Sequence, residues 1–157
     1  MTPIAATYRE AGQLRPLAAR LLNELGRFPL PLLQLMFRIA VAAVFFKSGL
    51  TKIASWELTL QLFQEEYAVP LLPVPLAATL ATAAELSMPV LLVVGLCARL
   101  AALPLLAMTL VIQLFVYPEN WAEHLMWASL LLFIATRGPG LLSLDHLVRR
   151  AVLDGRM

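Results

Sequence analysis

Apolar residues form four long runs along the chain, separated by short polar segments. The runs cover about residues 30–50, 71–96, 98–117 and 121–136. Each is close to the ~20 residues that an α-helix needs to cross ~30 Å of hydrocarbon, and the fourth is near the lower limit. Because the last three runs are joined by only a few residues, sequential helices should be antiparallel neighbours. The pattern predicts an all-α fold, an integral membrane four-helix bundle over residues 29–137.

Two further stretches are amphipathic at helical spacing and predict interfacial helices. The N-terminal segment, residues 1–28, has a stripe of leucines, Leu14, Leu17, Leu21 and Leu25, surrounded by arginines. Between the first two runs, aromatic and apolar side chains recur at Trp56, Leu60, Phe63 and Tyr67. We expect the second helix to cover the outer end of the bundle. Residues 138–157 are predicted to form a cytoplasmic C-terminal tail.

Composition supports a membrane protein with a single domain. Of the 157 residues, 61% are hydrophobic and 14% are charged, whereas soluble domains are typically about 45–50% apolar. The net charge is only +2 and the basic residues are scattered, which argues against a nucleic-acid partner. The single cysteine, Cys97, excludes an intramolecular disulfide, a CxxC redox pair and a multi-cysteine metal site. No metal site is predicted.

The distribution of basic residues predicts the orientation. With four spans, both termini lie on one side of the membrane. That side carries nine arginines: Arg9, Arg15, Arg20, Arg27, Arg99, Arg137, Arg149, Arg150 and Arg156. The positive-inside rule therefore places both termini in the cytoplasm.

Arg38 and Glu85 are charged residues deep inside predicted spans. Such residues are costly in a bilayer and usually functional. At 1.5 Å per residue, Arg38 lies about 12 Å and Glu85 about 15 Å from the same membrane face. The shared depth predicts an ion pair between two neighbouring antiparallel helices. Pro89 sharpens this prediction, because its ring removes the hydrogen bond to the carbonyl of Glu85 and should kink the helix there.

A second polar layer is predicted near the outer surface. It contains Lys47, Lys52, Gln113 and His124, which are cations, an amide and an imidazole suited to anionic or quinone-type head groups.

These charged and polar residues also have structural interpretations. In the structural interpretation, the Arg38–Glu85 pair only fixes helix register. His124 is more simply an interfacial residue than a proton carrier or ligand, since no second histidine lies near it in sequence.

Two segments resemble the signatures of the DoxX family. The first, RIAVAAVFFKSGLTKI, starts at Arg38, and the second, AATLATAAELSMPVLLVVGLCARLAAL, starts at Ala77. The family positions that match are Arg38, Gly49, Lys52, Glu85, Pro89, Gly95 and Arg99. The resemblance covers about residues 32–147. In it, Gly49, Pro89, Gly95 and Arg99 have structural roles.

The resemblance implies redox work at a quinone-containing membrane. DoxX proteins are similar to the small subunit of thiosulfate:quinone oxidoreductase, and relatives are associated with membrane redox and stress-response complexes. With one cysteine, this chain has no dithiol of its own for thiol exchange. We therefore expect a redox-linked subunit in a bacterial cytoplasmic (inner) membrane, with protein subunits or further copies of itself as partners. No cofactor is expected to be built in, and the expected ligand is a quinone.

Three function classes follow from these residues. In the first, Glu85 is the proton acceptor and Arg38 its electrostatic partner at a quinone-type head group, while Lys47, Lys52, Gln113 and His124 shape the approach. In the second, the chain is a non-catalytic scaffold whose ion pair acts only in assembly. In the third, an oligomer of the chain transports a metal ion or a small molecule.

Overall fold

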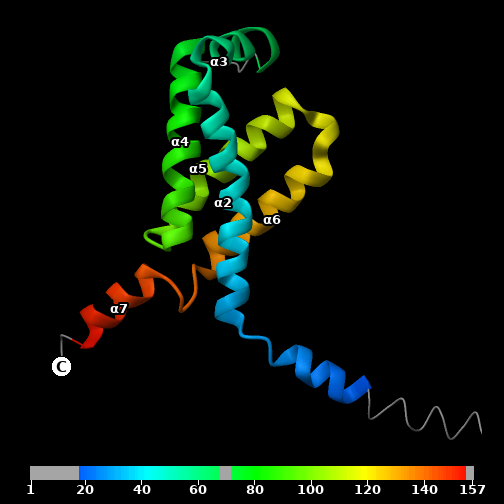
Figure 1. Cartoon of the computed structure of the whole chain (residues 1–157), viewed down its shortest axis with the longest axis vertical. Helices are drawn as coiled ribbons and strands as arrows, with labels where there is room; N and C mark the ends of the chain where they lie inside the picture. Colours follow the sequence, from blue (N-terminus) through cyan, green and yellow to red (C-terminus); the bar gives the residue numbers. More distant parts are fainter. Residues whose placement is uncertain (1–17, 68–71, 155–157) are drawn as a thin grey trace, which may run out of the picture.

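The computed structural model describes residues 18–67 and 72–154, and every regular element in these ranges is helical. Four helices form the bundle: α2 (Leu30–Ala54), α4 (Val74–Val94), α5 (Ala98–Val111) and α6 (Trp121–Arg137). Five further residues, Ile112–Val116, continue α5 as a π-helical segment, η2. Figure 1 shows two ends, which we call the α3 end and the α7 end after the helices that lie there.

The antiparallel pair α2 and α4 is the main contact of the bundle. Gly49 of α2 is buried, and a Cβ at that position would lie 2.9 Å from Leu86 and 3.0 Å from the Cβ of Glu85. A larger residue would push the helices apart, so this glycine allows α2 to approach α4 at the level of Glu85.

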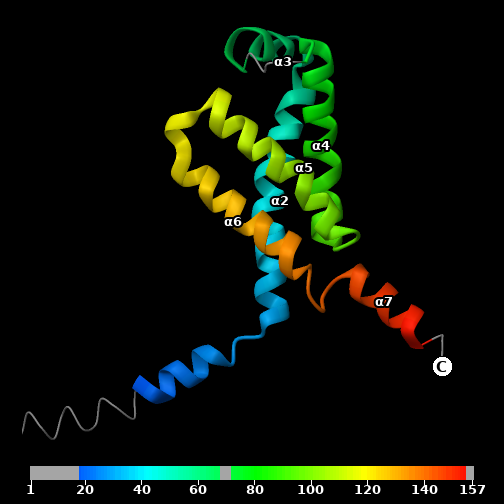
Figure 2. The same ribbon diagram turned by 180° about the vertical axis from the view of Figure 1, so that it is seen from behind.

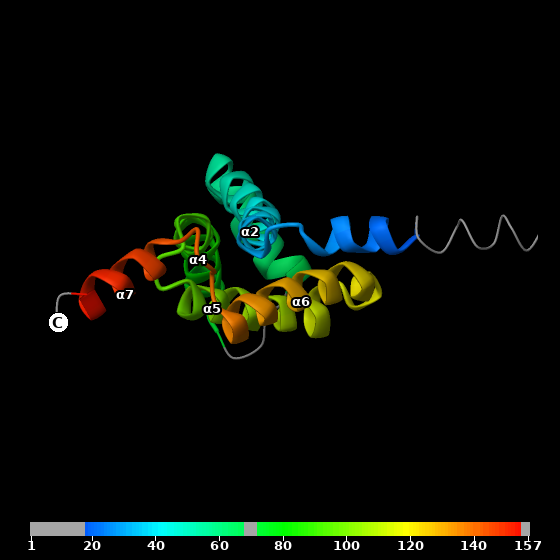
Figure 3. The same ribbon diagram turned by 90° about the horizontal axis from the view of Figure 1, so that it is seen from below.

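The second antiparallel pair, α5 and α6, lies along one side of the first pair (Figure 3). Near the α7 end the four helices share a core of buried apolar side chains: Val41, Ala42, Phe45, Leu92, Ala98, Ala101, Ala102, Leu105, Leu131 and Ile134. Toward the α3 end, α5 and α6 diverge from α2 and α4 (Figures 1 and 2). The packed core therefore occupies only part of the bundle.

The helix α3 (Trp56–Leu62) and the π-helical segment η1 (Phe63–Tyr67) lie across the end of the α2–α4 pair (Figure 1). Phe63 is buried against Ala77 and Ala78 of α4, with Leu60 and Tyr67 packed beside it. This confirms the predicted amphipathic helix after the first span and its position over one end of the bundle.

At the α7 end, the turn between α4 and α5 is tied to helix α7 (Leu144–Asp154). The carboxylate of Asp145 accepts hydrogen bonds from the backbone N–H groups of Cys97 and Ala98, at 2.7 and 3.0 Å. Its own N–H donates to the carbonyl of Gly95 at 2.9 Å. Asp145 thus caps the start of α5, whose N-cap residue Cys97 has the unusual φ of +48°.

The predicted spans agree with the observed helices to within a few residues. Three described helices are long and apolar enough to cross a membrane: Leu30–Ala54, Val74–Val94 and Ala98–Val116. The fourth, α6, has 17 residues and is about 25 Å long, so its crossing remains a prediction. Residues 18–26 form the described part of the predicted N-terminal helix, whereas Leu14 and Leu17 lie outside the described residues. The predicted C-terminal tail contains α7, a helix that was not predicted.

Candidate functional site

A cavity of about 680 Å³ lies in the half of the bundle nearer the α3 end, where the two helix pairs diverge. Side chains from all four bundle helices form its walls, and Phe63 and Tyr67 of η1 line it from the covering segment. Its apolar lining includes Val44, Phe45, Leu80, Ala81, Ala84, Pro104, Ala107, Met108, Val111, Ile112 and Trp127. Three small residues on α4, Ala77, Ala81 and Ala84, also line the cavity.

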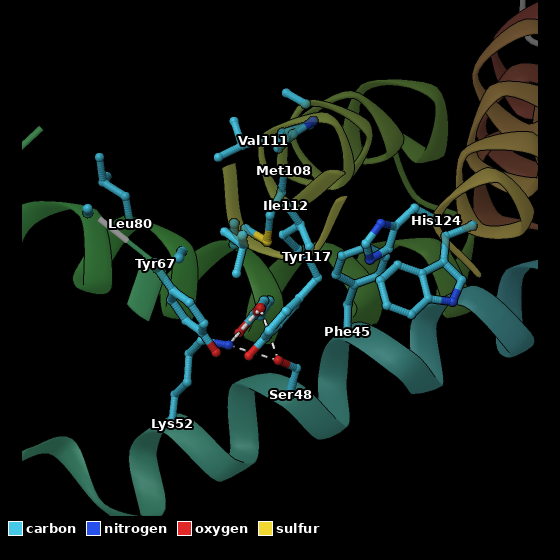
Figure 4. Close-up of a pocket in the computed structure, with 18 of the residues that line it drawn as sticks. Phe45, Ser48, Lys52, Tyr67, Leu80, Met108, Val111, Ile112, Tyr117 and His124 are labelled. Carbon is cyan, nitrogen blue, oxygen red and sulfur yellow. Dashed lines mark hydrogen bonds and ion pairs between the residues drawn. The ribbon is translucent and has the colours of Figure 1, made fainter. Parts of the chain in front are cut away.

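Glu85, Lys52 and Ser48 form a polar cluster in this apolar wall (Figure 4). Glu85 is only 3% exposed. The Lys52 Nζ atom lies 2.8 Å from Glu85 Oε2 and donates a hydrogen bond to Oε1 at 2.9 Å. The Ser48 hydroxyl donates to the same Oε1 at 3.1 Å. The cluster therefore places a buried carboxyl group, paired with a lysine, at the edge of an apolar cavity.

Within this cluster, Glu85 Oε1 accepts hydrogen bonds from Lys52 and Ser48, whereas Oε2 accepts none. Lys52 Nζ donates hydrogen bonds to Glu85 Oε1 and to Ser48 Oγ, at 2.9 and 2.8 Å, and forms an ion pair with Glu85 Oε2 at 2.8 Å. Among the described residues, the buried Glu85 Oε2 has no hydrogen-bond partner. A carboxylate has about four lone-pair positions, so Glu85 retains the capacity to accept further hydrogen bonds. The cluster thus presents an acceptor to the cavity.

Two tyrosines approach the same cluster from the covering segment and from the end of η2. Figure 4 shows Tyr67 and Tyr117 with their hydroxyl ends directed toward Lys52 and Ser48. Their rings meet edge to face, with centroids 6.2 Å apart. The Tyr117 hydroxyl also donates to Glu66 Oε1, and this hydrogen bond raises the pKa of Tyr117. Burial raises the pKa of Tyr67. Both phenols are therefore neutral at physiological pH.

His124 and Gln113 are paired, as their positions in the predicted polar layer suggested. His124 is buried, lines the cavity and has its Nδ1 2.7 Å from Gln113 Oε1. Because the amide oxygen only accepts, Nδ1 carries the proton in this contact. The Gln113 amide in turn donates to the carbonyl of Pro118 at 2.8 Å. The imidazole is therefore oriented by a second residue, in a way typical of positioned histidines.

The predicted ion pair between Arg38 and Glu85 is wrong. Arg38 is fully buried, but its guanidinium donates to backbone carbonyls: Leu92 at 3.1 Å, Val93 at 3.0 Å, and Leu142. Leu92 lies seven residues after Glu85, about 10 Å further along α4. Arg38 thus reaches toward the α7 end, while the cation beside Glu85 is Lys52.

The contacts of Arg38 explain why the long side chain lies in that direction. The last carbonyls of a helix have no partner within it and carry partial negative charge, so a guanidinium is well suited to cap them. Gly95 makes room for this cap, because a Cβ there would lie 2.4 Å from Arg38 Nη1 and the residue has φ of +75°. Arg38 joins α2, the end of α4 and the segment before α7, and is part of the bundle's structure.

The remaining predicted residues divide between the site and the scaffold. Lys47 is exposed and is not among the residues that line the cavity. Pro89 is buried within α4, which remains helical through it. Arg99 is exposed, and a Cβ at Gly138 would lie 3.0 Å from its Nε. Of the predicted ligand-binding residues, Lys52 and His124 line the cavity and Gln113 supports His124.

Ser48, Tyr67, Tyr117 and Glu66 were not among the predicted site residues. A signal for Ser48 is present in the sequence, because Phe45, Ser48 and Lys52 recur at three- and four-residue spacing and so share one helix face. The contact between Glu66 and Tyr117 joins residues 51 positions apart in the chain, and no spacing in the sequence predicts it.

Comparison with known proteins identifies the family. The DoxX family model matches residues 33–118, which is more than half of the chain and includes α2, α4 and α5. Neither the curated proteins nor the solved structures contain a match. The matched region holds Ser48, Lys52, Glu85 and Tyr117, although His124 lies beyond it. The chain belongs to the DoxX family of membrane proteins.

Proposed function

We propose that this protein binds the head group of a membrane quinone in the cavity, as a redox-linked subunit of a complex in a bacterial inner membrane. The observation that carries the proposal is the Glu85 carboxylate, buried in the wall of a cavity of about 680 Å³ and held by Lys52 and Ser48. Cavities of roughly 300–1,000 Å³ with apolar walls and a few convergent polar groups are typical of small-molecule sites.

The lining fits such a ligand in two respects. The ring and the isoprenoid tail of a quinone are apolar and match walls built from alanine, valine and aromatic side chains. The two ring oxygens need hydrogen-bonding groups, and the cavity lining supplies Glu85, Tyr67 and Tyr117. A hydroquinone supplies two O–H groups and two electrons when it is bound.

Glu85 is suited to accept the proton from one of those O–H groups. The proposed oxidation has two successive steps, and in each one O–H bond breaks, Glu85 takes the proton and becomes neutral, and one electron passes to an oxidised redox centre of a partner subunit. Glu85 releases the first proton to the aqueous phase before it accepts the second. Lys52, rather than Arg38, is the cation paired with Glu85 before the proton is transferred. His124 also lines the cavity and is oriented by Gln113.

The proposed orientation follows from the arginines. It places the α7 end, with both termini, in the cytoplasm and the α3 end with the cavity toward the outer face. Under this proposal the quinone enters from the bilayer and reaches Glu85 in the outer half of the membrane.

Equilibrium binding tests the proposal. Purified protein in phosphatidylcholine nanodiscs is incubated with decyl-ubiquinone or decyl-ubiquinol, and retained ligand is compared with that of empty nanodiscs. We expect Glu85→Gln to weaken binding of decyl-ubiquinol about tenfold, because a hydrogen bond to a charged group contributes about 1.5–3 kcal/mol. The matched control is Glu57→Gln, which removes an exposed carboxylate on α3.

Two results would overturn the proposal. One is retention of neither ligand form above empty nanodiscs. The other is equal binding by the Glu85→Gln variant and the wild-type protein. Either result, with a partner protein still copurifying, would favour the scaffold class.

A further inference from the structure

Tyr117 lines the cavity and also donates a hydrogen bond to a residue that does not line it. Its ring and hydroxyl line the cavity, whereas Glu66, which receives its hydrogen bond, is an exposed residue that is not among the lining residues. The proton of the Tyr117 hydroxyl is therefore directed to the Glu66 carboxylate, which does not line the cavity. What remains for a ligand in the cavity is the oxygen atom with its lone pairs.

The polar end of the cavity is consequently rich in acceptors. Glu85 accepts only, and its buried Oε2 has no hydrogen-bond partner among the described residues, while Lys52 donates to Glu85 Oε1 and to Ser48. The Ser48 proton is also directed to Glu85. Because the pKa of Tyr117 is raised, this phenol does not ionise to release Glu66. The hydroxyl of Tyr67, which also lines the cavity, is engaged in a side-chain hydrogen bond with Tyr117.

We infer that the Glu66–Tyr117 pair makes the cavity select the reduced, hydroxyl-bearing form of its ligand over the oxidised, carbonyl-bearing form. The inference rests on the proposed function and specifies its ligand. A hydroquinone donates through both oxygens and matches the Glu85 and Tyr117 acceptors. A quinone has only carbonyl acceptors and would place lone pair against lone pair at both positions. Glu66 is a positioning residue in this scheme, since it acts through the Tyr117 hydroxyl.

The experiment measures the ratio of two dissociation constants, those of decyl-ubiquinone and decyl-ubiquinol, in anaerobic nanodiscs of phosphatidylcholine. The variants are Glu66→Gln and Tyr117→Phe, and the matched control is Glu65→Gln, which changes the adjacent exposed carboxylate. In Glu66→Gln the amide NH₂ can donate to the Tyr117 oxygen, which frees the phenol proton to point into the cavity. We expect the wild-type protein to bind the reduced form more tightly and Glu66→Gln to lower the preference about threefold or more, the value of one hydrogen bond.

The double variant Glu66→Gln/Tyr117→Phe separates positioning from a general structural effect. If Glu66 acts through Tyr117, the Glu66→Gln change leaves the ratio unaltered once the hydroxyl is absent. A wild-type preference for the oxidised form, or a ratio that neither single variant alters, overturns the inference while the proposed function stands. Binding of neither form by the wild-type protein overturns the proposed function itself, so the two failures are distinguishable.

Discussion

Replacing Lys52 with methionine tests whether the buried ion pair stabilises the bundle. Methionine keeps the length and apolar stem of lysine but removes the charge, which leaves the 3% exposed carboxylate of Glu85 without its cation. Removing one partner of a buried pair typically costs about 3–5 kcal/mol. The carboxyl can instead take up a proton, which sets an upper limit on the cost.

That limit depends on pH. A carboxyl group in water has a pKa of about 4.3, and each pH unit corresponds to 1.36 kcal/mol, so protonation costs about 3.7 kcal/mol at pH 7 and about 1 kcal/mol at pH 5. We therefore expect Lys52→Met to lower the free energy of unfolding by about 3 kcal/mol at pH 7. The loss should shrink to about 1 kcal/mol at pH 5, because protons stabilise the variant's folded state.

The assay is reversible unfolding in mixed micelles of dodecyl maltoside and sodium dodecyl sulfate, followed by circular dichroism at both pH values. Lys47→Met is the matched control, since it removes an exposed lysine from the same helix. The double variant Lys52→Met/Glu85→Gln should recover much of the loss at pH 7, because no unpaired charge is then buried. Equal stability of Lys52→Met and Lys47→Met, or a loss that is the same at both pH values, would refute the reasoning.

Three further predictions concern the scaffold and the tyrosines. Gly49→Ala should destabilise the bundle by about 1–3 kcal/mol in the same unfolding assay, because the added Cβ would lie 2.9 Å from Leu86; an unchanged midpoint would contradict the close approach of α2 and α4. Arg38→Met should cost at least about 3 kcal/mol in the same assay, since it removes the cap on the Leu92 and Val93 carbonyls, and an unchanged midpoint would contradict this role. In an absorbance titration at 295 nm, Glu66→Gln should lower the pH at which Tyr117 ionises, because the carboxylate that raises its pKa is gone; an unchanged titration curve would exclude this hydrogen bond.

The helices were predictable because their signal lies in local composition and periodicity. The apolar runs, the Gly95 turn and the amphipathic stripe through Trp56 and Phe63 each specify structure within about 25 residues. Prediction of α7 failed because this segment was classified by its position after the last span. Its apolar positions, at helical spacing from Leu144 to Val152, were present in the sequence.

The pairing of charges could not be obtained from depth alone. The estimate placed Arg38 and Glu85 at similar depths by their backbone positions, but an arginine side chain extends several ångströms along the helix axis. The backbone carbonyls of Leu92 and Val93 are also strong partners that no residue pattern reveals. Lys52 was placed in the outer layer because the first span was predicted to end near residue 50. The helix continues to Ala54. Lys52 is therefore helical, shares one face of α2 with Phe45 and Ser48, and lines the cavity with them.

The most direct test of the central claim is to locate a bound quinone on the chain. An azido-ubiquinone is photolysed with the protein in nanodiscs, and the labelled residues are identified by mass spectrometry. The account predicts labels on cavity residues such as Met108 and Trp127, which disappear when excess decyl-ubiquinol is added. Labels confined to exposed, lipid-facing residues such as Leu100 and Leu132, without competition by decyl-ubiquinol, would contradict it.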